Sequence, residues 1–138
     1  MTPETRTVLC VDDDPDDRQI ILDAFLENNP DVDYVFVENG GELMAILYNS
    51  RPEEYPTLIL LDLNMPGMLG LQVLKEIKGN SRFSAIPTAV LTTSILPNDR
   101  KLSYDLGANC FFIKPSSFNE LVEITQYLSQ MWLQKAVS

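Results

Sequence analysis

Polar side chains that could carry chemistry follow apolar segments at four places in the sequence. They are two adjacent aspartates, a third aspartate, a threonine and a lysine: Asp12 and Asp13, Asp62, Thr92, and Lys114. Each segment is apolar up to the polar residue, which therefore marks the point where the chain leaves the core. In a parallel sheet the carboxyl ends of the strands share one edge, so these side chains are expected to form a single pocket.

The three carboxylates in this set indicate a bound divalent cation. Carboxylates held close together repel one another strongly unless a cation or protons neutralise them. An oxygen-only ligand set favours Mg²⁺ or Mn²⁺, and Mg²⁺ in proteins is usually held by one or two carboxylates together with phosphate oxygens. Lys114 would add a positive charge and Thr92 a hydroxyl donor, both suited to an incoming phosphoryl group. Asp62 could then act as the nucleophile and form an acyl phosphate, with the donor supplied from outside.

The composition excludes several other classes of function. The chain has 20 acidic against 10 basic residues and a formal charge of −10, with no run of Lys or Arg that could neutralise a nucleic acid or bind anionic lipid. We therefore expect no direct contact with nucleic acid or membrane. Histidine is absent, which excludes Ser-His and Cys-His nucleophile pairs and histidine metal ligands. Cys10 and Cys110 lie in apolar runs without the spacing of a zinc or redox site, and they are predicted to be core thiols.

Five short apolar or β-branched segments alternate with helical patterns along the chain. The segments are Thr7–Val11, Tyr34–Val37, Leu58–Leu61, Thr88–Leu91 and Cys110–Ile113. This alternation predicts an α/β fold with a five-stranded parallel sheet, (βα)5, and helices on both faces. Asp14 and Pro15 suit the start of the first helix, and Ser117 with Glu120 has the spacing of a capping box at the start of the last helix.

We expect one domain, residues 1–138, with no effector domain, because no linker, repeat or low-complexity segment interrupts the pattern. No apolar stretch is long enough to span a bilayer, and residues 1–6 are too polar for a signal peptide. The protein is therefore expected in the cytoplasm.

Each of these residues, taken singly, has an ordinary structural explanation. Aspartates at the start of a helix are usually caps or solvated charges, and we interpret Asp14, Asp16 and Asp17 in this way. A lysine before a proline usually lies on the surface of a loop, and Thr92 alone would be an ordinary hydroxyl at a strand end. The occurrence of all the signals in order, with an acidic pair directly after the first strand, favours a functional site.

Four segments together closely resemble the receiver domain of bacterial two-component response regulators, and the resemblance spans nearly the whole chain. The segments are Val8-Leu9-Cys10-Val11-Asp12-Asp13-Asp14-Pro15, Leu60-Leu61-Asp62-Leu63-Asn64-Met65-Pro66-Gly67, Val90-Leu91-Thr92-Thr93 and Phe111-Phe112-Ile113-Lys114-Pro115. One such motif alone is weak evidence, whereas the ordered set at this spacing is specific. The stretches Tyr127–Leu133 and Ala108–Phe111 are also similar to stand-alone receivers that serve phytochrome-like sensor kinases.

The resemblance implies a flavodoxin-like sheet and a definite chemistry for the acidic pocket. Asp62 would receive a phosphoryl group from a histidine on a sensor histidine kinase or histidine phosphotransfer protein. Asp12, Asp13 and Asp62 would hold Mg²⁺ or Mn²⁺ together with the backbone carbonyl of Asn64. Such a protein is a phosphoacceptor that catalyses its own phosphorylation and dephosphorylation, and it is not otherwise an enzyme.

The resemblance also implies how the protein would signal. Thr92 would hydrogen-bond a phosphoryl oxygen, Lys114 would pair with it, and the peptide bond between Lys114 and Pro115 would be cis. Phe111 lies where receivers carry an aromatic residue whose rotamer follows the threonine, and a simple core aromatic explains it equally well. In the switch mechanism, Thr92 moves toward the phosphoryl group and the face of the fourth helix, fifth strand and fifth helix changes shape. A downstream protein, which the sequence does not identify, would read that face, and formation of a homodimer through it stays open.

Two other functions fit part of this pattern. A phosphohydrolase of the haloacid dehalogenase type also uses an aspartate nucleophile, Mg²⁺, a hydroxyl residue and a lysine. It needs a second aspartate two places after the nucleophile, where this chain has Asn64. A receiver-like module that recognises partners without phosphorylation would be expected to lack Asp13, Asp62 or Lys114, and all three are present. Turnover of a small phosphoester would favour the first alternative, and partner binding unchanged by Asp62→Asn would favour the second.

Overall fold

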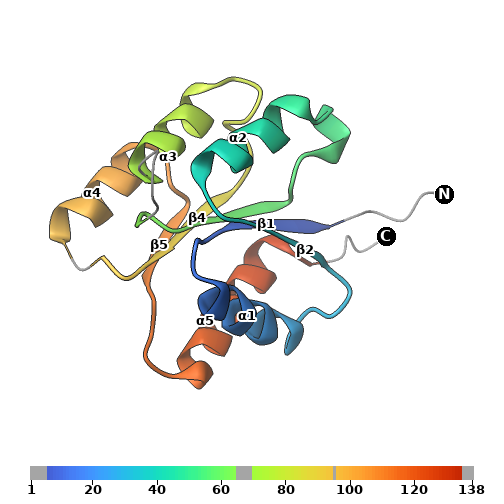
Figure 1. The fold of residues 1–138 in the computed structure, drawn as a ribbon, viewed down its shortest axis with the longest axis vertical. Coiled ribbons are helices and arrows are strands. Elements are labelled where there is room, and N and C mark those ends of the chain that lie inside the picture. The colour runs from blue at the N-terminus through green and yellow to red at the C-terminus, as the bar shows by residue number, and fades with distance from the viewer. Residues whose placement is uncertain (1–5, 65–69, 95, 135–138) are drawn as a thin grey trace.

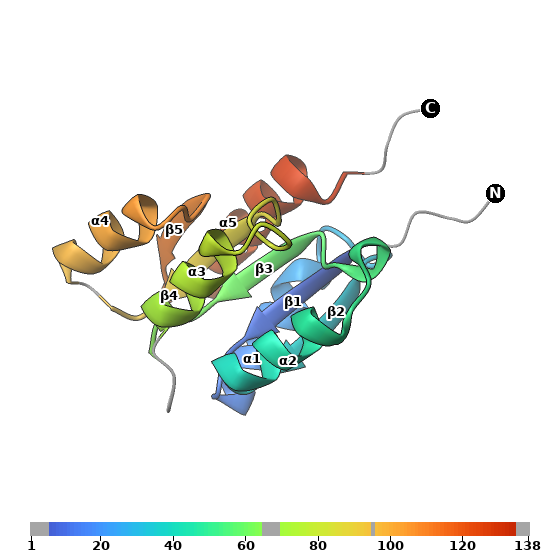
Figure 2. The same ribbon diagram turned by 90° about the horizontal axis from the view of Figure 1, so that it is seen from above.

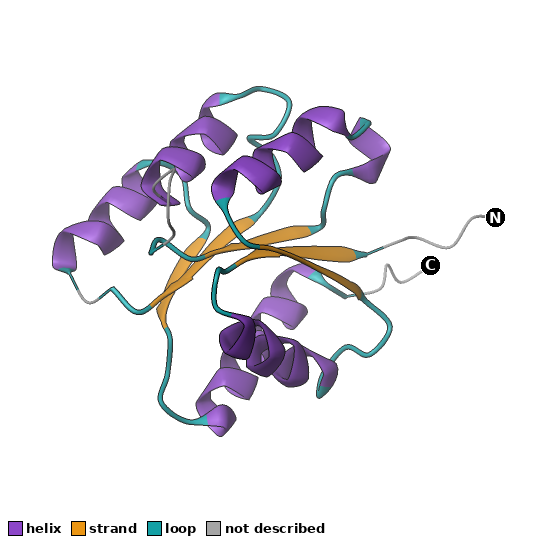
Figure 3. Cartoon of the chain, in the orientation of Figure 1, coloured by secondary structure: helices purple, strands orange, loops and turns teal. Residues whose placement is uncertain are grey.

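A parallel sheet forms the centre of the molecule in the computed structural model, which describes residues 6–64, 70–94 and 96–134. Its strands are β1 (Thr7–Val11), β2 (Asp33–Val37), β3 (Leu58–Leu61), β4 (Thr88–Thr92) and β5 (Cys110–Ile113). They lie in the order β2-β1-β3-β4-β5, and every neighbouring pair is parallel. The strands form a central layer with helices on either side (Figure 3). The predicted five-stranded parallel sheet is confirmed, with the second strand starting one residue earlier and the fourth ending one residue later than the sequence indicated.

Helices cover both faces of this sheet, as predicted. They are α1 (Pro15–Leu26), α2 (Gly40–Asn49), α3 (Gly70–Gly79), α4 (Pro97–Asp105) and α5 (Phe118–Trp132), with a short 3-10 helix, η1 (Pro52–Glu54). One face carries α1 and α5 (Figure 1). The other carries α2, α3 and α4, in that order across the sheet (Figure 2). None of the helices within the described residues is both long and apolar enough to cross a membrane.

Alternate residues of each strand pack into two separate apolar cores, one on each face. In β1, Val8 and Cys10 pack toward α1 and α5, whereas Leu9 and Val11 pack toward α2 and α3. This alternation follows from the two-residue period of a strand. Because the inner strands are covered on both faces, β3 and β4 are buried along their whole length.

Both cysteines lie in the core between the sheet and the pair α1 and α5, and both are free thiols. Burial raises the pKa of the Cys10 thiol well above its usual range and that of Cys110 to about 11. Thiols of this kind are poor nucleophiles. The prediction that they are core thiols is therefore confirmed.

Local sequence signals set several of the helix ends. The Asp14 side chain caps α1 by accepting hydrogen bonds from the backbone N–H groups of Asp16 and Asp17, and proline occupies the first helical position. Ser117 caps α5 in the same way by accepting from the Glu120 N–H at 3.2 Å. Gly107 follows α4 with φ of +107°, a conformation that side-chain-bearing residues rarely adopt.

The strand order and register bring separate parts of the sequence to one edge. β1 lies between β2 and β3, so the chain moves to one side of β1 after the first helix and to the other side after the second. Ligands in open α/β sheets bind at such a switch point, beyond the carboxyl ends of the strands. Val11 pairs with Leu61, and Thr92 pairs with Ile113. The residues that follow each strand therefore emerge at the same level.

Candidate functional site

The Lys114 ammonium joins two buried carboxylates across this edge of the sheet. Its Nζ lies 2.8 Å from Asp12 Oδ2 and 2.9 Å from Asp62 Oδ2. The side chains of Asp12 and Asp62 are only 2% and 6% exposed, and that of Lys114 is 13% exposed. Buried charges of this kind are stable only when they are paired and hydrogen-bonded. The sequence prediction that these three residues meet is therefore confirmed in position.

Backbone hydrogen bonds hold the second oxygen of each buried carboxylate. Asp12 Oδ1 accepts from the Asp14 N–H at 2.9 Å, and Asp62 Oδ1 accepts from the Asn64 N–H at 3.0 Å. Each bond spans two residues and fixes the turn that follows the strand. Because both oxygens are engaged, each carboxylate has a defined orientation toward Lys114.

The start of α3 packs directly against the backbone of Asp62. A Cβ atom on Gly70 would lie 2.5 Å from the Leu63 Cα and 2.8 Å from the Asp62 carbonyl oxygen, far inside normal contact. Glycine at this position therefore allows the helix to approach the site strand. Residues 65–69, which include the end of the second motif at Met65, Pro66 and Gly67, lie outside the described residues.

Asp13 adds an exposed carboxylate beside the buried pair. One carboxylate oxygen from each of Asp12, Asp13 and Asp62 lies within 4.8 Å of the others. Asp13 adds a fourth carboxylate to the three, Asp12, Asp17 and Asp62, that pair with the single Lys114 ammonium, so the site keeps a net negative charge. This oxygen-only set fits Mg²⁺ or Mn²⁺, since a divalent cation would offset the excess charge. The role of the Asn64 carbonyl as a further ligand stays a prediction.

Hydroxyl groups at the end of β4 contact the side chain of Asn64, two residues after Asp62. The Asn64 Nδ2 donates to Thr93 Oγ1 at 2.9 Å and approaches Thr92 Oγ1 at 3.5 Å. Thr92 Oγ1 also accepts from the Ser94 N–H at 3.2 Å, and its side chain is fully buried. The amide of Asn64 thus connects the turn after β3 to the end of β4.

Burial and ion pairing shift the pKa values of the two central groups. Burial raises the pKa of the Asp12 carboxyl above its usual range, with the hydrogen bond from Lys114 acting in the opposite direction. For Lys114, burial acts to lower the pKa, but hydrogen bonds to Asp12, Asp62 and Asp17 raise it well above its usual range. Lys114 therefore stays protonated at any pH at which the protein would work.

Asp17 is the site residue that sequence reasoning assigns wrongly. The sequence pattern predicts a cap or a solvated charge, but the Asp17 Oδ2 lies 2.9 Å from Lys114 Nζ. The sequence indicates which side of the helix Asp17 lies on, but not which residue it contacts. Asp17 lies one helical turn before Ile21, which with Ala24 and Phe25 forms the buried stripe of α1. A carboxylate on the buried stripe of a helix is not an ordinary solvated charge.

Two expectations for the fifth strand and its loop had different outcomes. Phe111 is 6% exposed and packs in the core on the α2 and α3 face, so its role as a switch residue stays a prediction. The expectation of a cis bond before Pro115 is wrong, because the described part of the chain contains no cis peptide bond. Trans is the intrinsically preferred form even before proline, by about 0.5–1 kcal/mol. With this bond in trans, Lys114 reaches both Asp12 and Asp62.

Comparison with known proteins places this site in a family. The model of the response regulator receiver domain matches residues 8–126. The response regulator Rcp1 from Synechocystis sp. is 34% identical over 134 residues, which are 94% of this chain and 90% of that protein. Rre1 from the same organism is 31% identical over 125 residues, which are 91% of this chain but only 52% of Rre1.

Solved structures give the same result for the fold. The crystal structure of the phosphorylated cyanobacterial phytochrome response regulator RcpA has a TM-score of 0.86 at 34% identity, covering 96% of this chain and 97% of that one. The Mn²⁺-bound form of Rcp1 has a TM-score of 0.83 at 32% identity, with the same coverage of each chain. Because the family model spans most of the chain and these relatives align along nearly all of it, this protein belongs to the response regulator receiver family.

Proposed function

We propose that this protein accepts a phosphoryl group on Asp62 from a histidine of a sensor histidine kinase or a histidine phosphotransfer protein. The observation that carries the proposal is the surroundings of Asp62: a buried carboxylate with the Lys114 ammonium at 2.9 Å and two further carboxylates close enough to share a metal ion with it. Receiver domains of two-component systems accept phosphoryl groups from histidine kinases, and this chain is a member of that family.

The transfer requires one bond to form and one to break at phosphorus. A carboxylate oxygen of Asp62 forms the new bond, and the bond from phosphorus to the donor histidine nitrogen breaks. The electron pair of the broken bond stays on that nitrogen, which takes up a proton. Lys114 donates to a phosphoryl oxygen, and the Thr92 hydroxyl lies at the end of β4, where it can donate to another. Water later attacks the phosphorus, the bond from phosphorus to the Asp62 oxygen breaks, and inorganic phosphate leaves as the free carboxylate is restored.

The carboxylates of Asp12, Asp13 and Asp62 would hold Mg²⁺ or Mn²⁺ during this transfer. When bound, the cation supplies positive charge that neutralises the carboxylates and the phosphoryl oxygens. Asp12 and Asp62 are already oriented by backbone hydrogen bonds from Asp14 and Asn64, so two of the ligands are fixed before a metal arrives. Two related structures support this, since one is of phosphorylated RcpA and the other is of Mn²⁺-bound Rcp1.

The signal would leave through the face formed by α4, β5 and α5. Thr92 lies at the end of β4, which pairs with β5. Movement of Thr92 toward a phosphoryl group would therefore change the packing around Phe111 in β5. These elements expose large apolar side chains that a downstream protein could contact, and two of them, Ile113 and Tyr127, line one open pocket between β5 and α5. A phytochrome-like sensor kinase is our proposed input, because the similar RcpA structure is that of a phytochrome response regulator.

The test is phosphorylation by a small donor with and without metal. Purified protein is incubated with acetyl phosphate, with Mg²⁺ or with EDTA, and the added mass is measured. Wild type and Asp31→Asn, which removes an exposed carboxylate just before the amino end of β2, at the opposite edge of the sheet from the site, should gain one phosphoryl group only with Mg²⁺. Asp62→Asn should gain none. Equal labelling of Asp62→Asn, or steady turnover of a small phosphoester by the wild type, would overturn the proposal.

A further inference from the structure

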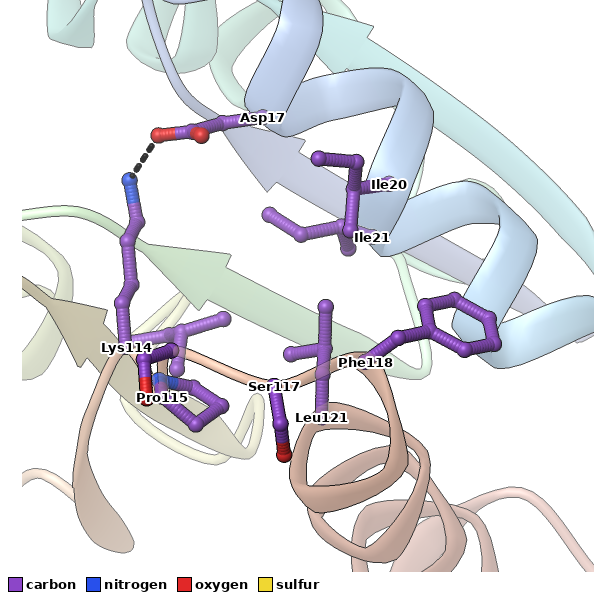
Figure 4. Close-up of a pocket in the computed structure, with 10 residues that line it drawn as sticks. Asp17, Ile20, Ile21, Lys114, Pro115, Ser117, Phe118 and Leu121 are labelled. Atoms are coloured by element: carbon purple, nitrogen blue, oxygen red, sulfur yellow. Dashed lines mark hydrogen bonds and ion pairs between the residues drawn. The ribbon is translucent and has the colours of Figure 1, made fainter.

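The third acceptor of the Lys114 ammonium is Asp17, in the first turn of α1. A lysine ammonium has three N–H donors, and here they point to Asp12, Asp62 and Asp17 at 2.8, 2.9 and 2.9 Å. Figure 4 shows the Asp17 carboxylate and the Lys114 ammonium facing each other at the edge of a cavity. All three donors of Lys114 are therefore occupied before any phosphoryl group arrives.

We propose that Asp17 is a positioning residue that competes with the phosphoryl group for the Lys114 ammonium and thereby slows phosphorylation of Asp62. The inference rests on the proposed function above. An incoming phosphoryl oxygen needs one N–H of Lys114, so one existing partner must release its bond. The charge of Asp17 also repels the phosphoryl oxygens from a short distance.

Exposure decides which partner gives way. The Asp17 side chain is 37% exposed, whereas those of Asp12 and Asp62 are 2% and 6% exposed. Water can replace Lys114 at Asp17, but a buried carboxylate that loses its partner pays the full desolvation penalty. The carboxylates of Asp12 and Asp62 suffice to hold the Lys114 ammonium at the site. The bond to Asp17 is therefore not needed to position the ammonium, but it occupies one of its donors.

The surroundings of Asp17 leave it room to move. It lines a cavity of about 230 Å³ between α1 and the start of α5, together with Ile20, Ile21, Phe118 and Leu121. In Figure 4 these apolar side chains border an open space next to the Asp17 and Lys114 pair. The Asp17 side chain can therefore change rotamer without displacing core side chains, because it borders a cavity and is partly exposed to solvent.

The experiment compares the rate of phosphorylation of three variants with that of wild type. Asp17→Asn removes the charge, Asp17→Glu keeps it, and Asp16→Asn is the matched control. Asp16 lies on the same helical turn, is exposed, and its carboxylate makes no hydrogen bond or ion pair with the described residues. At a subsaturating concentration of acetyl phosphate with Mg²⁺, Asp17→Asn should react about 1.5-fold to fivefold faster than Asp16→Asn, the size expected for losing one partly exposed ion pair. Asp17→Glu should stay near wild type.

A second measurement separates competition from a merely structural or metal-binding role. The affinity of each unphosphorylated variant for Mg²⁺ is measured by calorimetry, and the unfolding temperature is recorded. We expect Asp17→Asn to match Asp16→Asn in its affinity for Mg²⁺, and to unfold at the same or a slightly lower temperature because one partly exposed ion pair is lost, while reacting faster. A slower reaction, or an equal one, would overturn the inference about Asp17 and leave the proposed function standing. Failure of the wild type to gain a phosphoryl group would overturn both, so the two failures are distinguishable.

Discussion

Two partly buried lysines lie at opposite edges of the sheet. Each donates three hydrogen bonds, but the acceptors differ in charge. Lys114 follows β5 at the carboxyl edge and donates to three carboxylates. Lys78, in the last turn of α3, donates to the carbonyl oxygens of Ser84 and Ile86 at 3.2 and 2.7 Å, and to Asn109 Oδ1 at 3.1 Å. The acceptors of Lys78 are all neutral.

The charge of the acceptors distinguishes the two edges: the edge with Lys114 is suited to chemistry, and the edge with Lys78 has a structural role. Burial lowers the pKa of Lys78 because none of these acceptors carries a charge that favours its ammonium form. The pKa of Lys114 is raised because its carboxylate partners outweigh burial. Asn109 Oδ1 also accepts from the Thr88 N–H at 2.8 Å, so Lys78 and Asn109 tie α3 to the starts of β4 and β5. The Lys78 ammonium is held there by neutral oxygens alone, whereas the carboxyl edge keeps an excess of negative charge that favours binding of a further cation.

The largest expected effect is the loss of phosphorylation in Lys114→Met. Removing one charged donor aimed at the reacting group typically lowers a rate by about 100-fold or more. Lys78→Met should be phosphorylated at the wild-type rate, since Lys78 lies at the other edge. The measurement is the rate of mass gain with acetyl phosphate and Mg²⁺. Equal rates in the two variants would remove the functional contrast between the lysines.

Metal binding should stabilise the carboxyl edge by a comparable free energy. At a Mg²⁺ concentration about 100 times the dissociation constant, a ligand that binds only the folded state raises the free energy of unfolding by about 2.7 kcal/mol. Wild type and Lys78→Met should show the same gain in urea unfolding. Asp13→Asn, which removes an exposed member of the carboxylate cluster, should show much less at the same concentration. A full gain in Asp13→Asn would place the metal elsewhere.

Removal of Lys78 should reduce stability without touching the chemistry. Lys78→Met removes the ammonium hydrogen bonds to the Ile86 carbonyl and Asn109 Oδ1, and since each acceptor keeps a second donor from Thr88, the expected loss is about 0.5–1.5 kcal/mol for each bond removed. Lys75→Met, on an exposed position of the same helix, is the control and should change little. Chemical unfolding of both variants gives the difference. Equal stability would mean that water replaces the Lys78 hydrogen bonds.

The fold was predictable because local patterns and sheet order agree. Apolar runs of four or five residues, each followed by a helical pattern, allow few alternatives to a parallel sheet. Once that sheet is assumed, its carboxyl edge must collect the residue after each strand, which is why the amino-acid sequence alone places Asp12, Asp62 and Lys114 together. Helix caps such as Asp14 depend only on neighbouring residues, so they could also be predicted from the sequence.

The contacts that escaped prediction depend on geometry that sequence spacing does not fix. The pairing of Asp17 with Lys114 depends on how α1 is rotated against the sheet, and the contact of Lys78 with Asn109 joins residues 31 positions apart. Neither pair belongs to a local motif. The bond before Pro115 is trans, the intrinsically preferred form, whereas the resemblance to a family predicted cis.

The smallest expected effect is a difference in how the two lysines respond to alkaline pH. The ordinary pKa of lysine is 10.5, and that of Lys114 is higher in the folded protein. Its contribution to stability is fully present below pH 10.5 and is lost as the pH rises from 10.5 through the folded-state pKa, because the folded state then binds more protons than the unfolded state. Lys78 has a folded-state pKa below 10.5, so stability rises with pH between that pKa and 10.5 as an unfavourable charge is relieved.

Other groups titrate in the same range, so the measurement must rest on differences between variants. Burial raises the pKa of Tyr34 to about 12, which lowers the stability of every variant alike above the ordinary pKa of tyrosine. The free energy of unfolding of wild type minus that of Lys114→Met should fall above pH 10.5, whereas wild type minus Lys78→Met should rise as pH 10.5 is approached from below. Opposite slopes follow only if the carboxylates at one edge and the neutral oxygens at the other set the proton affinity of each lysine. Slopes of the same sign would show that burial governs both ammonium groups and that the carboxylates around Lys114 are screened by solvent.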